Sequence, residues 1–122
     1  MILADTGIWI DHFRSGDKEL QKRLGNGEIA MHPFVVGELA LGPLPKRNQT
    51  LFYLDHLPSL GMARQAEVRR MVEVHALHSQ GIGLIDAHLL AATLIHPGAE
   101  LWTRDGRLRK VATKLKILCR LG

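Results

Sequence analysis

Short apolar runs alternate along the chain with longer segments in which apolar residues recur every three or four positions. The short runs predict β-strands and the longer period predicts amphipathic helices. We expect strands at Met1–Ala4, Glu28–Met31, Leu60–Met62, Glu100–Thr103 and Lys116–Cys119. We expect helices at Thr6–Arg14, Lys18–Leu24, Phe34–Leu41, Lys46–His56, Arg64–Gln80, Leu84–Ile95 and Gly106–Lys114. This alternation is typical of an α/β domain with a mostly parallel sheet.

Length and composition favour one globular domain spanning residues 1–122. Of the 122 residues, 46% are hydrophobic and 23% are charged. Charged and polar residues interrupt every apolar segment, so we expect no membrane span. The first ten residues lack a basic leader and a cleavage site, which argues against a signal peptide. The single Cys119 cannot form an internal disulfide, and we therefore expect a cytoplasmic protein.

The charge balance is basic, with 16 Lys and Arg against 12 acids and a formal net charge of +4. A basic surface attracts nucleic acid through its phosphates. The same excess also keeps an ordinary protein soluble, so charge alone leaves both interpretations open.

Four carboxylates occupy positions that the topology would bring together. Asp5 directly follows the first strand, and Asp105 follows a later strand by two residues. Glu38 and Asp86 lie in the apolar helical segments that follow other strands. Ligands bind beyond the carboxyl ends of the strands in open parallel sheets. Clustered acids repel one another, and a hard divalent cation with a preference for oxygen would offset that repulsion.

Each acid also has a purely structural interpretation. Asp5 could cap the helix that follows it, Asp86 could interact with a helix dipole, and Asp105 could be a turn residue. Glu38 is harder to explain this way, because no cation lies near it in the sequence. The four acids taken together favour a metal site.

Four segments resemble, in order, the conserved blocks of the PIN-domain family and most of all the VapC toxins of bacterial toxin–antitoxin pairs. The segments read MILADTGIWIDHFR, FVVGELALG, GLIDAHLLAATLI and LWTRDGRLRKVA. The resemblance implies a three-layer α/β/α sandwich on a parallel sheet of about five strands. It also implies a Mg²⁺- or Mn²⁺-dependent endoribonuclease that cleaves tRNA or rRNA, forms a homodimer and is inhibited by a cognate antitoxin.

The resemblance assigns roles to individual residues. The acidic quartet corresponds to Asp5, Glu38, Asp86 and Asp105, and we expect Asp5 and Asp105 to be direct metal ligands. Asp86 would bind directly or through water, and Glu38 would bind or orient the water. Thr6 and Thr103 match hydroxyl residues of the family. Two positions differ: Gly7 replaces a common Ser, and Arg107 replaces an acid found in some members.

Cations that follow the last acid are candidates for binding RNA phosphates, or else they form an ordinary solvated helix face. They are Arg104, Arg107, Arg109 and Lys110. The alternative function is a non-catalytic module that binds RNA or a partner protein through the same fold. An aspartic protease, suggested by the tripeptide at residues 5–7, is disfavoured by the helical periodicity that dominates the chain.

Overall fold

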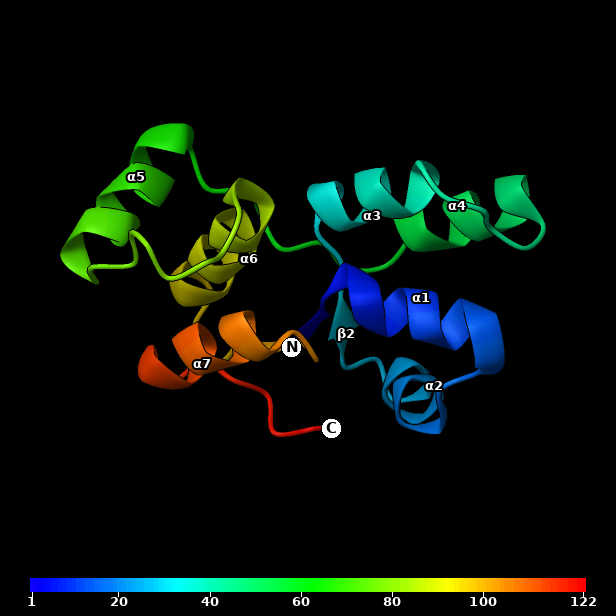
Figure 1. Cartoon of the computed structure of the whole chain (residues 1–122). Coiled ribbons are helices and arrows are strands. Elements are labelled where there is room, and N and C mark those ends of the chain that lie inside the picture. Colours follow the sequence, from blue (N-terminus) through cyan, green and yellow to red (C-terminus); the bar gives the residue numbers. More distant parts are fainter.

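The computed structural model describes residues 1–122 (Figure 1). Seven helices and three strands follow one another in an order close to that predicted. They are β1 (Ile2–Ala4), α1 (Thr6–Ser15), α2 (Lys18–Gly25), β2 (Ile29–Ala30), α3 (Pro33–Ala40), α4 (Arg47–Asp55), α5 (Gln65–Val74), α6 (Leu84–Ile95), β3 (Glu100–Trp102) and α7 (Gly106–Lys114).

The three strands form one parallel sheet in the order β2-β1-β3. Residue Ile2 pairs with Ile29 on one side and with Glu100 on the other, so β1 is the central strand. Helices α1 to α4 lie on one side of the sheet, and α5, α6 and α7 lie on the other (Figure 1). The predicted α/β class, parallel sheet and covering helix layers are therefore confirmed.

The prediction of five strands is wrong. Leu60–Met62 and Lys116–Cys119 do not form strands; each edge of the sheet gains only one isolated parallel bridge. These bridges join Met31 to Ser59 and Leu101 to Leu118. Pro58 precedes the first bridge and has no amide donor, and Lys116 before the second has a φ of 61°. Both segments therefore meet the sheet edge too briefly to continue a ladder.

The predicted helix Arg64–Gln80 is too long, because α5 ends at Val74. The backbone then enters the left-handed region at Ala76, Ser79 and Gly81, with φ values of 53°, 61° and 77°. Only the last of these is a glycine, the residue that tolerates this region best. Nothing in the sequence before residue 81 therefore marks the end of the helix.

One hydrophobic core of 30 buried residues lies between the sheet and the two helix layers. Trp9 and Trp102 are fully buried within it. Every residue of β1 is buried, which explains its continuous apolar run. No helix is both long and apolar enough to cross a bilayer.

Leu3, at the centre of β1, is 0% exposed, so we expect Leu3→Ala to destabilise the fold strongly. The lost burial and the cavity left behind cost about 2–5 kcal/mol of unfolding free energy. Leu41→Ala is the matched control, because Leu41 is 91% exposed and its truncation should change stability by less than about 0.5 kcal/mol. Urea unfolding followed by circular dichroism measures both; equal effects would contradict the central place of β1 in the core.

Candidate active site

Asp5 joins the carboxyl ends of two neighbouring strands. Its backbone N–H donates to the carbonyl of Trp102 at 2.8 Å, continuing the pairing of β1 with β3. Its Oδ1 accepts from the amide of Thr6 at 2.8 Å and caps α1. Its Oδ2 accepts from the hydroxyl of Thr103, also at 2.8 Å. Both carboxylate oxygens are therefore held in fixed directions at the strand ends.

Glu38 reaches the same place from α3. The Thr6 hydroxyl donates to Glu38 Oε1 at 2.6 Å, which ties the first turn of α1 to the last turns of α3. Thr6 therefore makes two contacts. Its side-chain hydroxyl donates to Glu38, and its backbone amide donates to the carboxylate of Asp5. Gly7 beside it is exposed, and a β-carbon built there would touch nothing within 4 Å, so the missing hydroxyl of this position leaves the contacts intact.

Asp105 and Asp86 begin the two helices on the other side of the sheet. Asp105 Oδ1 accepts from the amide of Leu108 at 3.0 Å and caps α7, while its own N–H donates to Thr103 Oγ1 at 3.1 Å. Asp86 Oδ2 accepts from the amide of Gly83 at 3.2 Å at the start of α6. The helix-start roles considered for Asp5 and Asp86 are therefore confirmed, and Asp105, considered as a turn residue, caps α7.

Electrostatic repulsion links the four acids. Burial raises the pKa of Asp5, and repulsion from Glu38 and Asp105 raises it further, against hydrogen bonds from Thr103 and Thr6 that lower it. Burial also raises the pKa of Asp86, with added repulsion from Asp5 and Asp105. None of the five ion pairs in the structure involves any of these acids; the pairs are Arg23–Glu19, Arg23–Glu28, Arg64–Glu67, Arg104–Asp11 and Arg104–Asp17. The cluster is thus negative and lacks a protein cation to balance it.

The donor set fits a hard divalent cation in its chemistry. All four candidates supply carboxylate oxygens, which Mg²⁺ and Mn²⁺ prefer over nitrogen or sulfur. No three acidic, His or Cys side chains converge closely enough in the structure to form a metal cage by themselves. Asp5, Asp86 and Asp105 each direct one carboxylate oxygen at a backbone amide.

Arg104, a candidate for binding RNA, makes its contacts within the protein. Its guanidinium donates to Asp11 Oδ2 at 2.7 Å and to Asp17 Oδ2 at 2.6 Å, and it holds the carbonyl of Gly122 at 2.9 Å. The Arg104 hydrogen bond holds the pKa of Asp17 below its usual value, although burial acts in the opposite direction. The sequence analysis did not predict the pairing of Asp17 with Arg104.

The other three candidate cations differ in their surroundings. Arg109 Nη1 donates to the carbonyl of Thr103 at 3.0 Å and so stabilises the backbone that follows β3. Arg107 lies across the turn at Gly81, where an added β-carbon would come within 2.8 Å of its Cδ. Lys110 is exposed and has no hydrogen-bond partner in the structure. Arg107 and Lys110 are therefore the two that remain available to a ligand.

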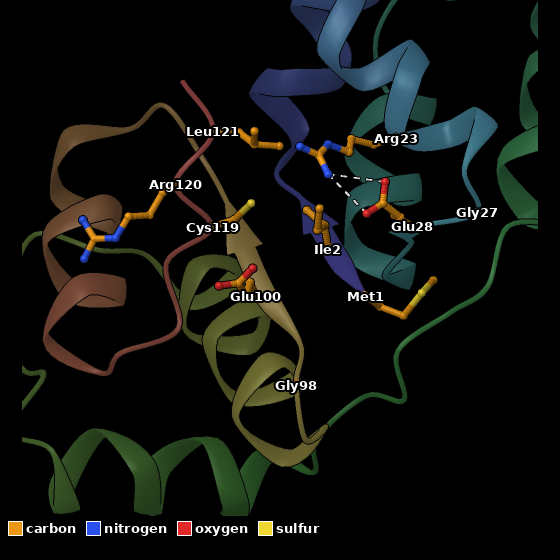
Figure 2. A pocket seen from close by; sticks show the side chains of 10 residues that line it. All are labelled: Met1, Ile2, Arg23, Gly27, Glu28, Gly98, Glu100, Cys119, Arg120 and Leu121. Atoms are coloured by element: carbon orange, nitrogen blue, oxygen red, sulfur yellow. Dashed lines mark hydrogen bonds and ion pairs between the residues drawn. The ribbon is translucent and has the colours of Figure 1, made fainter.

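Two hollows flank the sheet in different ways. A cavity of about 420 Å³ lies at the amino ends of the strands, beside Ile2, Glu28 and Glu100 (Figure 2). It is at the opposite end of β1 from Asp5 and does not include any of the four acids. A groove of about 640 Å³ between α1 and α3 reaches one of them, because Glu38 forms part of its wall together with Arg14. Ile10, Phe13 and Leu44 make the rest of that groove largely apolar.

Comparison with known proteins agrees with this arrangement. The model of the PIN domain family matches residues 2–114, so the chain belongs to this family, as its four sequence blocks predicted. It is 42% identical over 109 residues to Ribonuclease VapC32 of Mycobacterium tuberculosis. The match covers 89% of this chain and 88% of that protein, and the same identity is found with the protein from a second strain.

The raised pKa of Asp5 predicts a stability change with a definite sign. An ionised carboxylate that the fold disfavours costs stability above its raised pKa, and this cost fades as pH falls through that pKa towards 3.8. We expect Asp5→Asn, in chelator, to unfold at higher urea than wild type at neutral pH, by a margin that shrinks towards pH 4. The control is Asp55→Asn, which removes an exposed carboxylate at the end of α4. A wild type that is as stable as Asp5→Asn at neutral pH would contradict the expected cost.

Proposed function

We propose that this protein is a metal-dependent endoribonuclease of the VapC type that hydrolyses phosphodiester bonds in RNA. The observation that carries the proposal is a group of four carboxylates without protein counter-cations at the carboxyl ends of β1 and β3. Membership of the PIN domain family and the likeness to Ribonuclease VapC32 support it. The chain would act as a single domain over residues 1–122.

In this proposal Asp5, Asp86 and Asp105 hold Mg²⁺, with Glu38 as a further ligand or as the group that orients the attacking water. Mn²⁺ would substitute for Mg²⁺. Such an ion lowers the pKa of bound water and offsets charge on the phosphate oxygens. The protein's own contribution is orientation. Thr103 donates to Asp5 Oδ2 and Thr6 donates to Glu38 Oε1, so both carboxylates stay aimed through the reaction.

The RNA would lie against α7, beyond the acids. Arg107 and Lys110 lie on this helix with no ion-pair partner, and cations of this kind position a nucleic acid through its phosphates. Arg104 and Arg109 would not contact the RNA directly. They would hold in place the Thr103–Asp105 segment, which carries the last acid. The substrate we propose is tRNA or rRNA, cleaved at selected sites.

Regulation would come from a cognate antitoxin. The largely apolar groove beside Glu38 offers it a place, because a segment lying there would reach Glu38 at the edge of the site. We also propose that the protein forms a homodimer and acts in the cytoplasm. Exposed Val74 and Ile95, which flank a second apolar hollow between α5 and α6, provide surface for such a dimer.

A non-catalytic module is the second candidate, and one observation favours it. Asp5, Asp86 and Asp105 each have a structural role as partners of amides at helix starts, so their presence does not by itself require catalysis. Cleavage of RNA by the folded, metal-bound protein separates the two candidates.

We expect the purified, antitoxin-free protein to produce discrete new ends in total cellular RNA with Mg²⁺ and none with chelator. Asp5→Asn should lower the cleavage rate by roughly 100-fold or more, because a charge-stabilising ligand is lost while the cap on Thr6 is retained. Mapping of RNA 5′ and 3′ ends by sequencing measures this and names the substrate.

Asp55→Asn is the matched control, since it removes an exposed carboxylate of α4 far along the chain from the quartet. The thermal midpoint of each protein with and without Mg²⁺ shows whether it is folded and metal-bound, because a ligand of the native state raises stability. Wild type that is folded, stabilised by Mg²⁺ and still produces no new ends would favour the non-catalytic module.

Binding to RNA should depend on salt through the free cations of α7. In an Asp5→Asn background with chelator present, which slows cleavage, we expect Lys110→Gln and Arg107→Gln each to weaken binding to all sequences alike. The slope of log affinity against log salt should become shallower by roughly 0.7 for each phosphate of single-stranded RNA that is no longer neutralised. Fluorescence anisotropy measures the slopes, with Lys46→Gln on the α4 side as control. Unchanged slopes would remove α7 from the RNA interface.

A further inference from the structure

Of the four acids, Asp86 has the weakest connection to the rest of the candidate site. Hydrogen bonds through two threonines link the other three acids to one another. Asp86 Oδ2 accepts only from the amide of Gly83, at 3.2 Å. Gly83 ends the segment that joins α5 to α6, residues 75–83, here called the α5–α6 turn. The direction of the Asp86 carboxylate therefore depends on how this turn is held.

The α5–α6 turn has a backbone conformation that its own residues do not favour. Ala76 and Ser79 have φ values of 53° and 61°, in the left-handed region that residues with a β-carbon adopt only at a cost. Ser79 and Gln80 are exposed, so burial at the tip of the turn does not offset this cost. Strained backbone of this kind persists where neighbouring structure holds it in place. The neighbouring element is α7, past which the turn runs on its way to α6 (Figure 1).

Arg107, in the first turn of α7, lies directly across Gly81. A β-carbon built on Gly81 would lie 2.8 Å from Cδ, 3.2 Å from Nε and 3.1 Å from Nη1 of Arg107. These distances are too short for ordinary van der Waals contacts, so the missing side chain at Gly81 is what leaves room for the arginine. Arg107 follows Asp105 by two residues, and Gly81 precedes Gly83 by two. The contact therefore joins the start of α7 to the part of the turn that orients Asp86.

Lys114 makes a second contact between α7 and the turn. Its Nζ donates to the carbonyl of His75 at 3.0 Å, where the turn leaves α5. Lys114 follows Arg107 by seven positions, which is about two helical turns, so both side chains lie on the same face of α7. The two cations thus contact the turn near both of its ends.

We propose that Arg107 and Lys114 hold the α5–α6 turn against α7 and so fix the carboxylate of Asp86 relative to that of Asp105. Both cations are positioning residues for the nuclease site, and this role rests on the proposed function. Loss of a group that orients a metal ligand commonly weakens metal binding by roughly 10- to 100-fold. Arg107 remains exposed, so the same side chain can still contact an RNA phosphate.

The role of Lys114 is measured first without metal or RNA. We expect Lys114→Met, in chelator, to speed hydrogen exchange at the amides of Leu77 and Gly83 by about tenfold, because both keep their hydrogen bonds only while the turn keeps its conformation. Exchange at the amides of β1 should not change, which separates a loosened turn from a loss of global stability. Lys110→Met is the matched control, since Lys110 is exposed on the same helix. Equal exchange in wild type and Lys114→Met would overturn the proposal.

Gly81 and Gly98 form a matched pair that tests the contact with Arg107. Their φ values are 77° and 79°, so alanine is strained to a similar extent at both positions. At Gly81 the added β-carbon would meet Arg107, whereas at Gly98 it would meet nothing within 4 Å. We expect Gly81→Ala to raise by about tenfold the Mg²⁺ concentration that gives half of the full thermal stabilisation, and Gly98→Ala to leave it unchanged. The same Mg²⁺ dependence in both variants would contradict the role of Arg107.

The cleavage assay separates positioning from RNA binding. Lys114 lies outside the proposed RNA contacts, so we expect Lys114→Met to lower kcat by about tenfold and to leave KM for RNA unchanged. Lys114→Arg should retain most of kcat, because a guanidinium can also donate to the carbonyl of His75. A raised KM with an unchanged kcat in Lys114→Met would show that the positioning role is wrong.

The positioning role and the proposed function fail in different ways. If Mg²⁺ stabilises the wild type and no RNA is cleaved, the nuclease function is wrong, while hydrogen exchange and the Mg²⁺ titration still decide whether α7 positions Asp86. If the wild type cleaves RNA and both Lys114→Met and Gly81→Ala match it in exchange and in Mg²⁺ dependence, the positioning role alone is wrong. A wild type that Mg²⁺ does not stabilise would contradict both.

Discussion

The pairing of β1 with a parallel strand on each side is the constraint on which the rest of the molecule depends. Because the chain leaves β1 and β3 in the same direction, Asp5 and the Thr103–Asp105 segment must come out side by side. The helices that follow these two strands cover opposite faces of the sheet (Figure 1). The point between them is a topological switch point, where open α/β sheets place their ligands. The pairing of β1 with β3 therefore brings Asp5 and Asp105 to this point.

The acids are contributed equally by the two helix layers. Asp5 and Glu38 belong to α1 and α3, whereas Asp86 and Asp105 begin α6 and α7. Thr103 ties the layers together, since its hydroxyl donates to Asp5 while accepting from the amide of Asp105. Hydrogen bonds through Thr6 and Thr103 thus hold Asp5, Glu38 and Asp105 near one another, whereas the Asp86 carboxylate is bonded only to the amide of Gly83. A divalent ion would be attracted by charge that folding has already assembled.

Local signals predicted the structure best. The bounds of α6 and α7 were predicted correctly. The quartet was predicted from strand ends and sequence blocks together. The two outermost strands and the end of α5 were predicted wrongly. They depend on how many residues of each segment remain in contact with the neighbouring strand or helix. The Arg104 pairing was missed for the same reason, since Asp11 is 93 positions away in sequence.

The caps made by the acids also bear on how this fold can change over evolutionary time. The residues of an active site often reduce the stability of the fold, so a change that removes activity often raises the free energy of unfolding. Here an Asp→Asn change at a cap would keep an oxygen for the backbone amide while removing one repelling charge. A lineage could thus lose chemistry in one step and keep a sound, well-folded protein. Related proteins could therefore keep the structure and its binding partners and yet have no nuclease activity.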